Sequence, residues 1–145
     1  MVRNKAVSYA VMAMVDIAER SGTGDKTVEV QAADLANRLG FPTAYTAKVL
    51  SSLARASLLR SDRGPRGGFQ LARSPQEITL FDILQAVGAW NAGDIALTPS
   101  APPKLRRSLN EAMTKAMSHA REVLEEVRLA DLLEAPAHTP EPVGV

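Results

Sequence analysis

The sequence predicts a mainly α-helical protein that carries one small β-hairpin and a long helix in its C-terminal half. Apolar residues recur at helical spacing along most of the chain, whereas β-type patterns occur only around residues 27–30 and 58–72. The chain has 145 residues, of which 46% are hydrophobic and 23% are charged. This composition is ordinary for one globular domain with its own core.

Residues 5–20 are predicted to form a helix with one buried face. The apolar side chains of this segment follow the i, i+3, i+4, i+7 spacing of an amphipathic helix. They are Val7, Ala10, Val11, Met14, Ile17 and Ala18. The glycine-containing run at residues 21–25 ends the helix, and residues 27–30 then alternate as a short strand does.

Two further helices are predicted over residues 32–39 and 43–57, joined by the tight turn Gly40-Phe41-Pro42. Gly40 stands where a left-handed residue commonly ends a helix. Two helices joined by a glycine-containing turn are typical of a helix-turn-helix. The second helix has a buried face made of Ala47, Leu50, Leu53, Ala54 and Leu58.

A β-hairpin is predicted next, with arms over residues 58–61 and 68–72. Its tip combines Arg63 and Arg66 with glycine and proline, so that a narrow, basic loop can approach another molecule closely. A helix-turn-helix followed by a hairpin is the element order of a winged helix-turn-helix. We therefore predict a domain of this class over residues 1–88.

The rest of the chain is predicted to contain two more helices. Thr79 and Asp82 have the spacing of a capping box, which indicates the start of a short helix. Residues 89–103 contain three prolines and are predicted to be an irregular linker. Residues 104–133 carry a continuous apolar seam, which predicts a long dimerisation helix. The proline-containing residues 134–145 are expected to form a disordered tail.

Composition and motifs exclude several classes of function. The chain has no cysteine, which excludes disulfides, thiolate catalysis, classical zinc fingers and all-cysteine iron–sulfur sites. His119 and His138 are predicted to be surface residues without a metal. No segment reaches the ~18 consecutive apolar residues of a membrane span or resembles a signal peptide, so we expect a cytoplasmic protein. The sequence shows no nucleophile–base constellation, so no enzyme is predicted.

The net charge of +1 hides a segregation of charge along the chain. Residues 1–73 carry 11 Lys and Arg against 6 Asp and Glu, whereas residues 74–145 carry 6 against 10. A basic half of this kind favours a polyanionic partner such as double-stranded DNA. A solvated surface without a partner is the alternative.

The second helix of the helix-turn-helix is the candidate recognition helix, because Tyr45, Lys48, Ser52 and Arg55 form one stripe opposite its apolar face. In a major groove, the first residues of such a helix approach base edges and later ones contact phosphates, while a wing arginine can enter the minor groove. The alternative is that Tyr45 packs its ring on a neighbour and Lys48 is only solvated. The predicted DNA-binding residues are Thr43, Ala44, Tyr45, Lys48, Ser52, Arg55, Arg60, Arg63, Arg66 and Arg73.

The most specific motif of the chain is the wing sequence RGPRGGFQLAR at residues 63–73. It is accompanied by Tyr9-Ala10-Val11, YTAKVL at residues 45–50, LARASLL at 53–59, ITLFDIL at 78–84 and LADLL at 129–133. Together these segments resemble the Rrf-two family of bacterial winged-helix transcription regulators, over about residues 5–133.

The resemblance implies a homodimer whose long helices cross, which would place two winged helices on successive major grooves of a palindromic operator. The apolar seam supports a dimer independently, because so short a domain cannot cover so long a helix. The alternative is that the long helix packs on the N-terminal helix of its own chain.

The chain also departs from the family. Many members hold an iron–sulfur cluster through three cysteines placed between the short helix and the long helix, and this chain has none, so it cannot hold a cluster in that way. Gln31 replaces the usual serine cap of the second helix, Ser57 stands where glycine is typical, and Ala89 replaces a commonly acidic residue.

If the chain senses a signal, that signal must then be something other than a cluster. We hypothesise an apolar pocket for a small effector; the alternative is that the same side chains fill the dimer core. The residues of this pocket are Trp90, Ile95, Leu97, Met113 and Met117. The predicted function is that of a sequence-specific DNA-binding transcriptional regulator, a repressor that uses no cofactor. The rival function is a winged-helix protein-interaction module that does not read DNA sequence.

Overall fold

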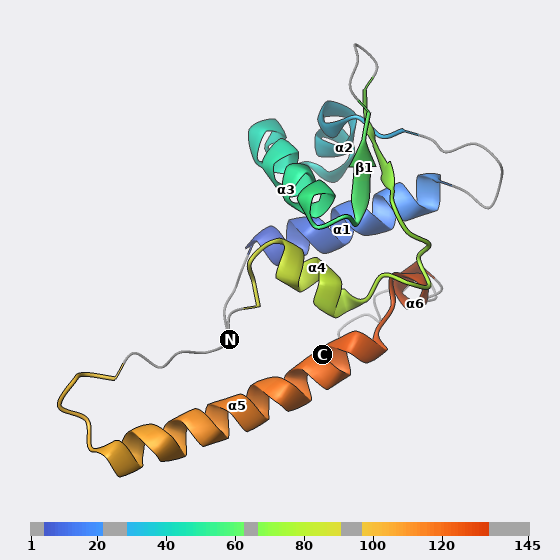
Figure 1. Cartoon of the computed structure of the whole chain (residues 1–145). Coiled ribbons are helices and arrows are strands. Elements are labelled where there is room, and N and C mark those ends of the chain that lie inside the picture. The colour runs from blue at the N-terminus through green and yellow to red at the C-terminus, as the bar shows by residue number, and fades with distance from the viewer. Residues whose placement is uncertain (1–4, 22–28, 63–66, 91–96, 134–145) are drawn as a thin grey trace, which may run out of the picture.

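A computed structural model describes residues 5–21, 29–62, 67–90 and 97–133 of the chain (Figure 1). The architecture is mainly α-helical with one two-stranded antiparallel sheet, as the sequence predicts. The elements are α1 (Lys5–Arg20), α2 (Ala32–Leu39), α3 (Thr43–Arg55), β1 (Leu59–Ser61), β2 (Phe69–Leu71), α4 (Leu80–Ala86), α5 (Pro103–Glu126) and α6 (Leu129–Leu133).

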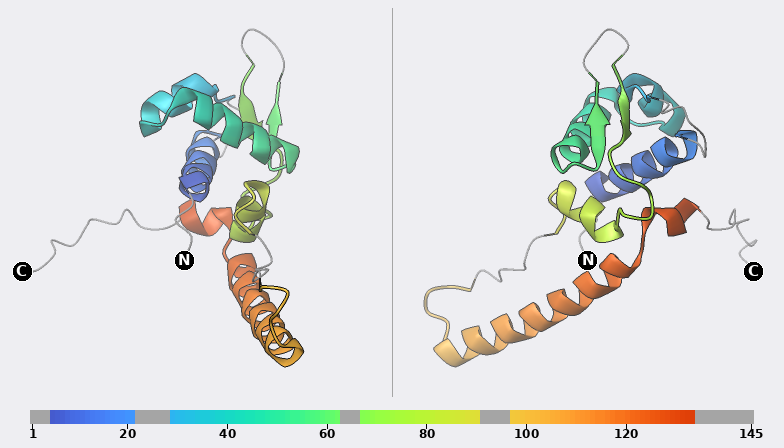
Figure 2. Two further views of the ribbon diagram at one scale, coloured as in Figure 1. Left: turned by 90° about the vertical axis from the view of Figure 1, so that its left-hand side faces the viewer. Right: turned by 45° about the vertical axis from the view of Figure 1, so that its right-hand side comes forward.

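Helix α1 is the centre of the core. It lies between the α2–α3 pair on one side and α4 and α6 on the other (Figure 2). The predicted apolar face is buried, with Ala10, Met14 and Ile17 fully removed from solvent. A single amphipathic helix that contacts α2, α3, β2, α4 and α6 fixes the positions of these elements relative to one another.

The helix-turn-helix forms as predicted, but α3 ends at Arg55, two residues earlier than expected. Ser57 has a left-handed conformation with φ of 61°, and the N–H of Leu58 donates to the carbonyl oxygen of Leu53 at 3.0 Å. This is the bond pattern of a Schellman motif. The same pattern ends α2 at Gly40 and α4 at Gly88, both with φ of 69°.

The wing is shorter than predicted, with Leu59 paired to Leu71 and Ser61 paired to Phe69. Val30 forms a separate antiparallel bridge to β2, because it exchanges backbone hydrogen bonds of 2.9 and 2.8 Å with Phe69. Gly68 permits this approach, since a Cβ atom there would lie 3.0 Å from the carbonyl oxygen of Val30. Residues 27–28 of the predicted strand and the wing tip at residues 63–66 lie outside the described residues.

Helix α4 begins with the predicted capping box. The backbone N–H of Asp82 donates to Thr79 Oγ1 at 3.1 Å, and the backbone N–H of Thr79 donates to Asp82 Oδ2 at 3.0 Å. These two hydrogen bonds satisfy backbone N–H groups that have no partner within the helix, so they fix the residue at which the short helix begins.

The prediction of one continuous helix over residues 104–133 is wrong. Helix α5 ends at Glu126, the backbone of Val127 is extended, and α6 starts at Leu129. The break lets the N–H of Leu129 donate to the carbonyl oxygen of Ile78 at 2.8 Å and buries the Leu129 side chain completely. An uninterrupted helix would carry Leu129 away from the core, so its burial favours the break.

Helix α5 projects away from the rest of the domain (Figure 1). None of its residues is buried, and the side chains of Leu105 and Val123 are 47% and 60% exposed. Its C-terminal part packs on α4, where the guanidinium carbon of Arg121 lies 4.6 Å from the ring centroid of Phe81. Within the described residues, α5 therefore contacts α4 rather than running along α1. None of the described helices combines the length and hydropathy that a membrane span requires.

Candidate nucleic-acid interface

Helix α3 presents a polar face to solvent because its opposite face is anchored in the core. Val49, Leu50 and Leu53 are buried, and the hydroxyl of buried Thr46 donates to the carbonyl oxygen of Pro42 at 2.9 Å. Thr43, Ala44, Lys48 and Arg55, which the sequence predicts to contact DNA, are all exposed. The helix can therefore approach a groove without any rearrangement of its core contacts.

Tyr45 is half-buried, unlike the exposed residues beside it. Its ring packs edge-on against Tyr9 with 5.1 Å between centroids, and the Tyr9 ring lies 4.1 Å from the Phe41 ring. This aromatic cluster ties the start of α1 to the turn and to α3. Hydrophobic periodicity did not reveal it, because the three rings come from three separate elements. Tyr45 remains a predicted DNA contact, with its ring held in one orientation.

The C-terminal end of the stripe is linked by hydrogen bonds. Ser52 Oγ donates to the carbonyl oxygen of Lys48 at 3.2 Å and accepts from Arg55 Nη2 at 3.3 Å. In the described part of the chain, Arg55 has no carboxylate within ion-pair distance. Its positive charge is thus available to a phosphate or another anion.

The wing arms run away from the core beside α3 (Figure 1). Arg60 on β1 is exposed and stands opposite Gln70 on β2, whose buried Oε1 has no hydrogen-bond partner within the described residues. The predicted minor-groove residues Arg63 and Arg66 lie outside the described residues. Of the predicted wing cations, the structure therefore places Arg60 only.

Arg73 follows the wing and turns toward α4. Its Nη2 lies 3.5 Å from Asp82 Oδ2, and its side chain is 40% exposed. Together with Ser52 and Arg55, Arg73 lines a cleft of about 430 Å³ between α3 and α4. Among the described residues, the predicted DNA contacts thus lie on α3 and, with Arg60, on the wing, while Arg73 lies at the border of α4.

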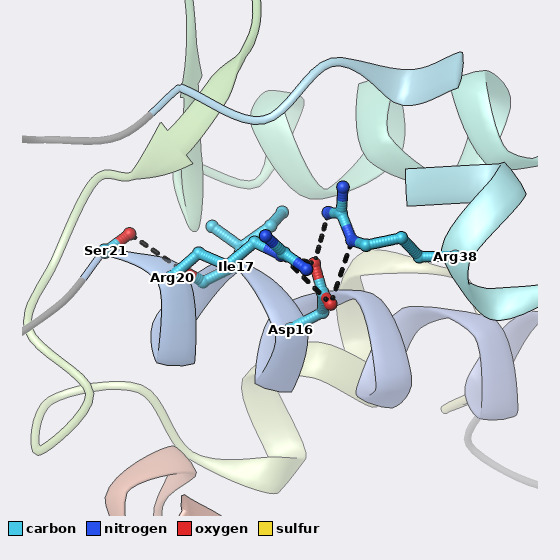
Figure 3. Close-up of polar contacts among 5 residues, drawn as sticks. All are labelled: Asp16, Ile17, Arg20, Ser21 and Arg38. Carbon is cyan, nitrogen blue, oxygen red and sulfur yellow. Dashed lines mark hydrogen bonds and ion pairs between the residues drawn. The ribbon is translucent and has the colours of Figure 1, made fainter. Parts of the chain in front are cut away.

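The carboxylate of Asp16 on α1 links this helix to α2, the first helix of the helix-turn-helix (Figure 3). Arg38 Nη2 on α2 donates to Asp16 Oδ2 at 2.7 Å, and Arg20 Nε donates to the same oxygen at 3.2 Å. Near them, Ser21 Oγ donates to the carbonyl oxygen of Ile17 at 2.7 Å. The spacing of Asp16 and Arg20 is visible in the sequence as an i, i+4 pair, but Arg38 lies 22 residues away and carries no sequence signal.

A pair of acidic residues lies near the tip end of the wing arms, because Asp62 directly follows β1 and Glu29 precedes Val30, which pairs with Phe69. A hydrogen bond with the Asp62 carboxyl raises the pKa of Glu29 above its ordinary value, and desolvation and the negative charge of Asp62 act in the same direction. Asp62 directly follows the strand that carries Arg60, so protonation of Glu29 changes the charge next to the wing.

The predicted effector residues are only partly placed. Trp90 packs edge-on against Phe81, with 5.3 Å between ring centroids. Leu97, Met113 and Met117 are half-buried. Ile95 lies outside the described residues.

The part of the chain that the structure describes offers no set of ligands for a metal ion. The described residues contain no group of three or more His, Cys, Asp or Glu side chains that could hold a metal ion. His119 is exposed, and its Nδ1 lies 3.7 Å from Glu122 Oε2. His138 is outside the described residues.

Comparison with known proteins agrees with this geometry. The family model described as "Rrf2: Iron-dependent Transcriptional regulator" matches residues 3–135. The HTH-type transcriptional regulator Rv1287 of Mycobacterium tuberculosis is 35% identical over 127 residues, which cover 86% of this chain and 76% of that protein. The regulator IscR of Cereibacter sphaeroides is 28% identical over 130 residues, covering 87% of this chain and 83% of IscR.

Solved structures of similar fold include T. potens IscR, with a TM-score of 0.67 and 27% identity over 99% of this chain and 94% of that one. The cysteine regulator CymR of B. subtilis has a TM-score of 0.67 at 22% identity, over 92% of this chain and 96% of CymR, and its likeness concerns the fold alone.

The family description implies bound iron, but the side chains of this chain do not supply the ligands that an iron–sulfur cluster needs. Iron–sulfur clusters are held chiefly by cysteine thiolates, and this chain has no cysteine. The matched regulators are not enzymes, and the features described above are those of a DNA-binding regulator. The chain belongs to the Rrf2 (Rrf-two) family of transcriptional regulators.

Proposed function

We propose that this protein is a sequence-specific transcriptional repressor that binds a palindromic operator as a homodimer and needs no iron–sulfur cluster. The observation that carries the proposal is the exposure of Thr43, Ala44, Lys48 and Arg55 on a helix whose other face is locked into the core. A helix held in this way can enter a major groove as a rigid body.

The proposed contacts follow from position along α3 and the wing. Thr43, Ala44, Tyr45 and Lys48, near the start of the helix, approach base edges. The residues proposed to contact phosphates or the minor groove are Ser52, Arg55, Arg60, Arg63, Arg66 and Arg73.

The homodimer rests on the unpartnered face of α5. Leu109, Met113, Met117 and Leu124 are only half-buried in the single chain, and they form one stripe with the exposed Leu105. Pairing of this stripe with a second copy removes it from water, which is the main favourable term in association. A two-fold dimer then spaces its recognition helices by ~34 Å or a multiple of that distance.

Selection of fragmented genomic DNA by the purified protein, followed by sequencing, tests the proposal. We expect an enriched palindrome whose half-sites are about one helical turn apart. Addition of the protein to a promoter carrying that palindrome should lower transcription in vitro. A protein-interaction module would enrich no sequence, and that result would contradict DNA reading.

The sequence-predicted effector pocket at Trp90, Leu97, Met113 and Met117 stays a proposal. Trp90 is the one tryptophan of the chain, so its fluorescence reports on this region alone. A saturable change on adding an apolar metabolite would support an effector there. The absence of any fluorescence change across a broad panel of metabolites would instead support the alternative that these side chains fill the dimer core.

A further inference from the structure

We propose that the cleft between α3 and α4 binds a small organic anion, either a carboxylate or a phosphate monoester, through Arg55 and Arg73. The cleft has a volume of about 430 Å³. This lies within the range of ~300–1,000 Å³ that is usual for small-molecule sites. Its lining residues are Ser52, Arg55, Ala56, Leu58, Arg73, Asp82, Gln85 and Ala86.

The charges of the lining favour an anion. Among the described residues that line the cleft, two arginines stand against the single carboxylate of Asp82. Asp82 Oδ2 accepts the backbone N–H of Thr79 at 3.0 Å, which holds it in the capping box. Its distance of 3.5 Å from Arg73 Nη2 exceeds the ~2.7–2.9 Å of a strong charge-assisted hydrogen bond. Arg73 can therefore form a shorter bond to a ligand oxyanion.

Arg55 supplies the second cation. Among the described residues its guanidinium donates to a neutral hydroxyl, Ser52 Oγ, at 3.3 Å and pairs with no acid. Two guanidinium-bearing residues that line one cleft suit the planar or tetrahedral oxygens of a carboxylate or a phosphate.

The composition of the cleft also suits a free small anion, which would compete with a DNA phosphate for Arg55 and Arg73. Ala56 and Ala86 give the lining an apolar part that can accept the carbon skeleton of an organic ligand. Asp82 lies in the same cleft and would repel a continuous line of phosphates. The Gln85 carboxamide adds a neutral donor and acceptor.

Such a ligand would join two elements with different roles. Arg55 belongs to α3, whereas Asp82 and Gln85 belong to α4, which packs on α5. A bound anion would fix α3 relative to α4, and any difference in its affinity between the free and DNA-bound forms would change the affinity for DNA by the same factor. This regulatory consequence rests on the proposed function, but the binding of the anion does not.

The test is a titration of the full-length protein without DNA. Inorganic phosphate, succinate and glycerol 3-phosphate are added separately at constant ionic strength, and the arginine Nε–Hε signals are followed by nuclear magnetic resonance. We expect at least one probe to shift the Arg55 and Arg73 signals saturably, and Arg55→Gln or Arg73→Gln to weaken its binding at least tenfold. The matched control Arg107→Gln, on the exposed face of α5, should bind as the wild type does.

Three results would overturn the proposal. These are the absence of saturable binding by all three probes, equal weakening by Arg107→Gln, and shifts at Arg55 and Arg73 caused by a short DNA duplex but by none of the small anions. The last result would assign the cleft to the DNA backbone. Amide spectra of each variant show whether it is folded, so a loss of binding is not confused with unfolding. Because no DNA is needed for the main arm, the proposed function can fail without affecting the outcome.

Discussion

Arg38 Nη2 donates to Asp16 Oδ2 at 2.7 Å, and this contact joins the first helix of the helix-turn-helix to the central helix of the core (Figure 3). The Asp16 side chain is 15% exposed, and the Arg38 side chain is 30% exposed. A partly buried ion pair between two elements is better shielded from water than one on a helix surface. It positions α2, the helix on which α3 packs.

Arg38→Gln should therefore lower the free energy of unfolding by about 1 kcal/mol, since a hydrogen bond to a charged group across two helices is lost. Arg20→Gln is the matched control, because it removes the i, i+4 partner of the same carboxylate at 44% exposure. Its cost should be no more than about 0.5 kcal/mol. Urea denaturation of both variants checks the difference. An equal loss in the free energy of unfolding for the two variants would mean that the ion pair between α1 and α2 stabilises the fold no more than the pair within α1.

Ser57→Gly should raise the free energy of unfolding by up to about 1 kcal/mol. Ser57 occupies the left-handed conformation that Gly40 and Gly88 adopt in the same motif, and this conformation costs a residue with a Cβ about 1–2 kcal/mol. Part of the gain is offset by the greater freedom of glycine in the unfolded chain. The reciprocal variant Gly40→Ser should be destabilised by a similar amount. Thermal unfolding of both proteins checks the pair, and a destabilised Ser57→Gly would contradict the argument.

Lys48→Ala should weaken binding to the selected operator by roughly tenfold and reduce the slope of log K against log salt by about 1 if the lysine also neutralises a phosphate. Lys48 is exposed on the outward face of α3. Lys115→Ala, an exposed lysine on α5, is the charge-matched control and should leave the affinity within about twofold. Fluorescence anisotropy at several salt concentrations measures both quantities. An unchanged affinity in Lys48→Ala would remove this residue from the interface.

Met113→Asp should convert a dimer into a monomer, because it places a charge in the middle of the apolar stripe of α5. Its side chain is half-buried in the single chain, and no α5 residue is buried, so the fold of the monomer should tolerate the change. Ser118→Asp adds the same charge to the opposite, exposed face and should remain dimeric. Sedimentation velocity distinguishes the two. A Met113→Asp variant that stays dimeric would place the interface elsewhere.

Glu29→Gln should gain stability relative to the wild type as the pH rises. The pKa of Glu29 is raised from 4.5 by the hydrogen bond with Asp62, so ionisation of this carboxyl is less favourable in the folded state than in the unfolded state. The wild-type penalty is absent below pH 4.5, grows as the pH rises through the folded-state pKa, and is complete above it. Melting temperatures of both proteins between pH 4 and pH 8 check this. In an Asp62→Asn background the pH dependence of the difference should become smaller, because the contributions of Asp62 are removed while desolvation remains. An unchanged pH dependence would show that Asp62 is not its cause.

Local patterns determined most of the elements. Three of these patterns are local: the spacing of Ala10, Met14 and Ile17, the turn at Gly40, and the capping box of Thr79 and Asp82. Each spans one helical segment or a few residues, so it depends on short-range stereochemistry that the sequence shows directly. The exposed stripe on α3 follows from the same periodicity. The family motif at residues 63–73 strengthened the assignment of the wing, although the tip itself lies outside the described residues.

Only the tertiary structure decided the features that join distant segments. The break after Glu126 exists because Leu129 is buried beside Ile78, far from it in sequence, and no local signal ends the apolar seam there. The ring contact of Tyr45 with Tyr9 and the hydrogen bond of Arg38 to Asp16 likewise join residues that are far apart in the sequence. Arg55 and Arg73 are predicted as separate phosphate contacts by the sequence, but the packing of α3 against α4 brings them into one cleft. Periodicity specifies which face of an element is buried, whereas the choice of partner depends on how the faces of distant elements fit together in the core.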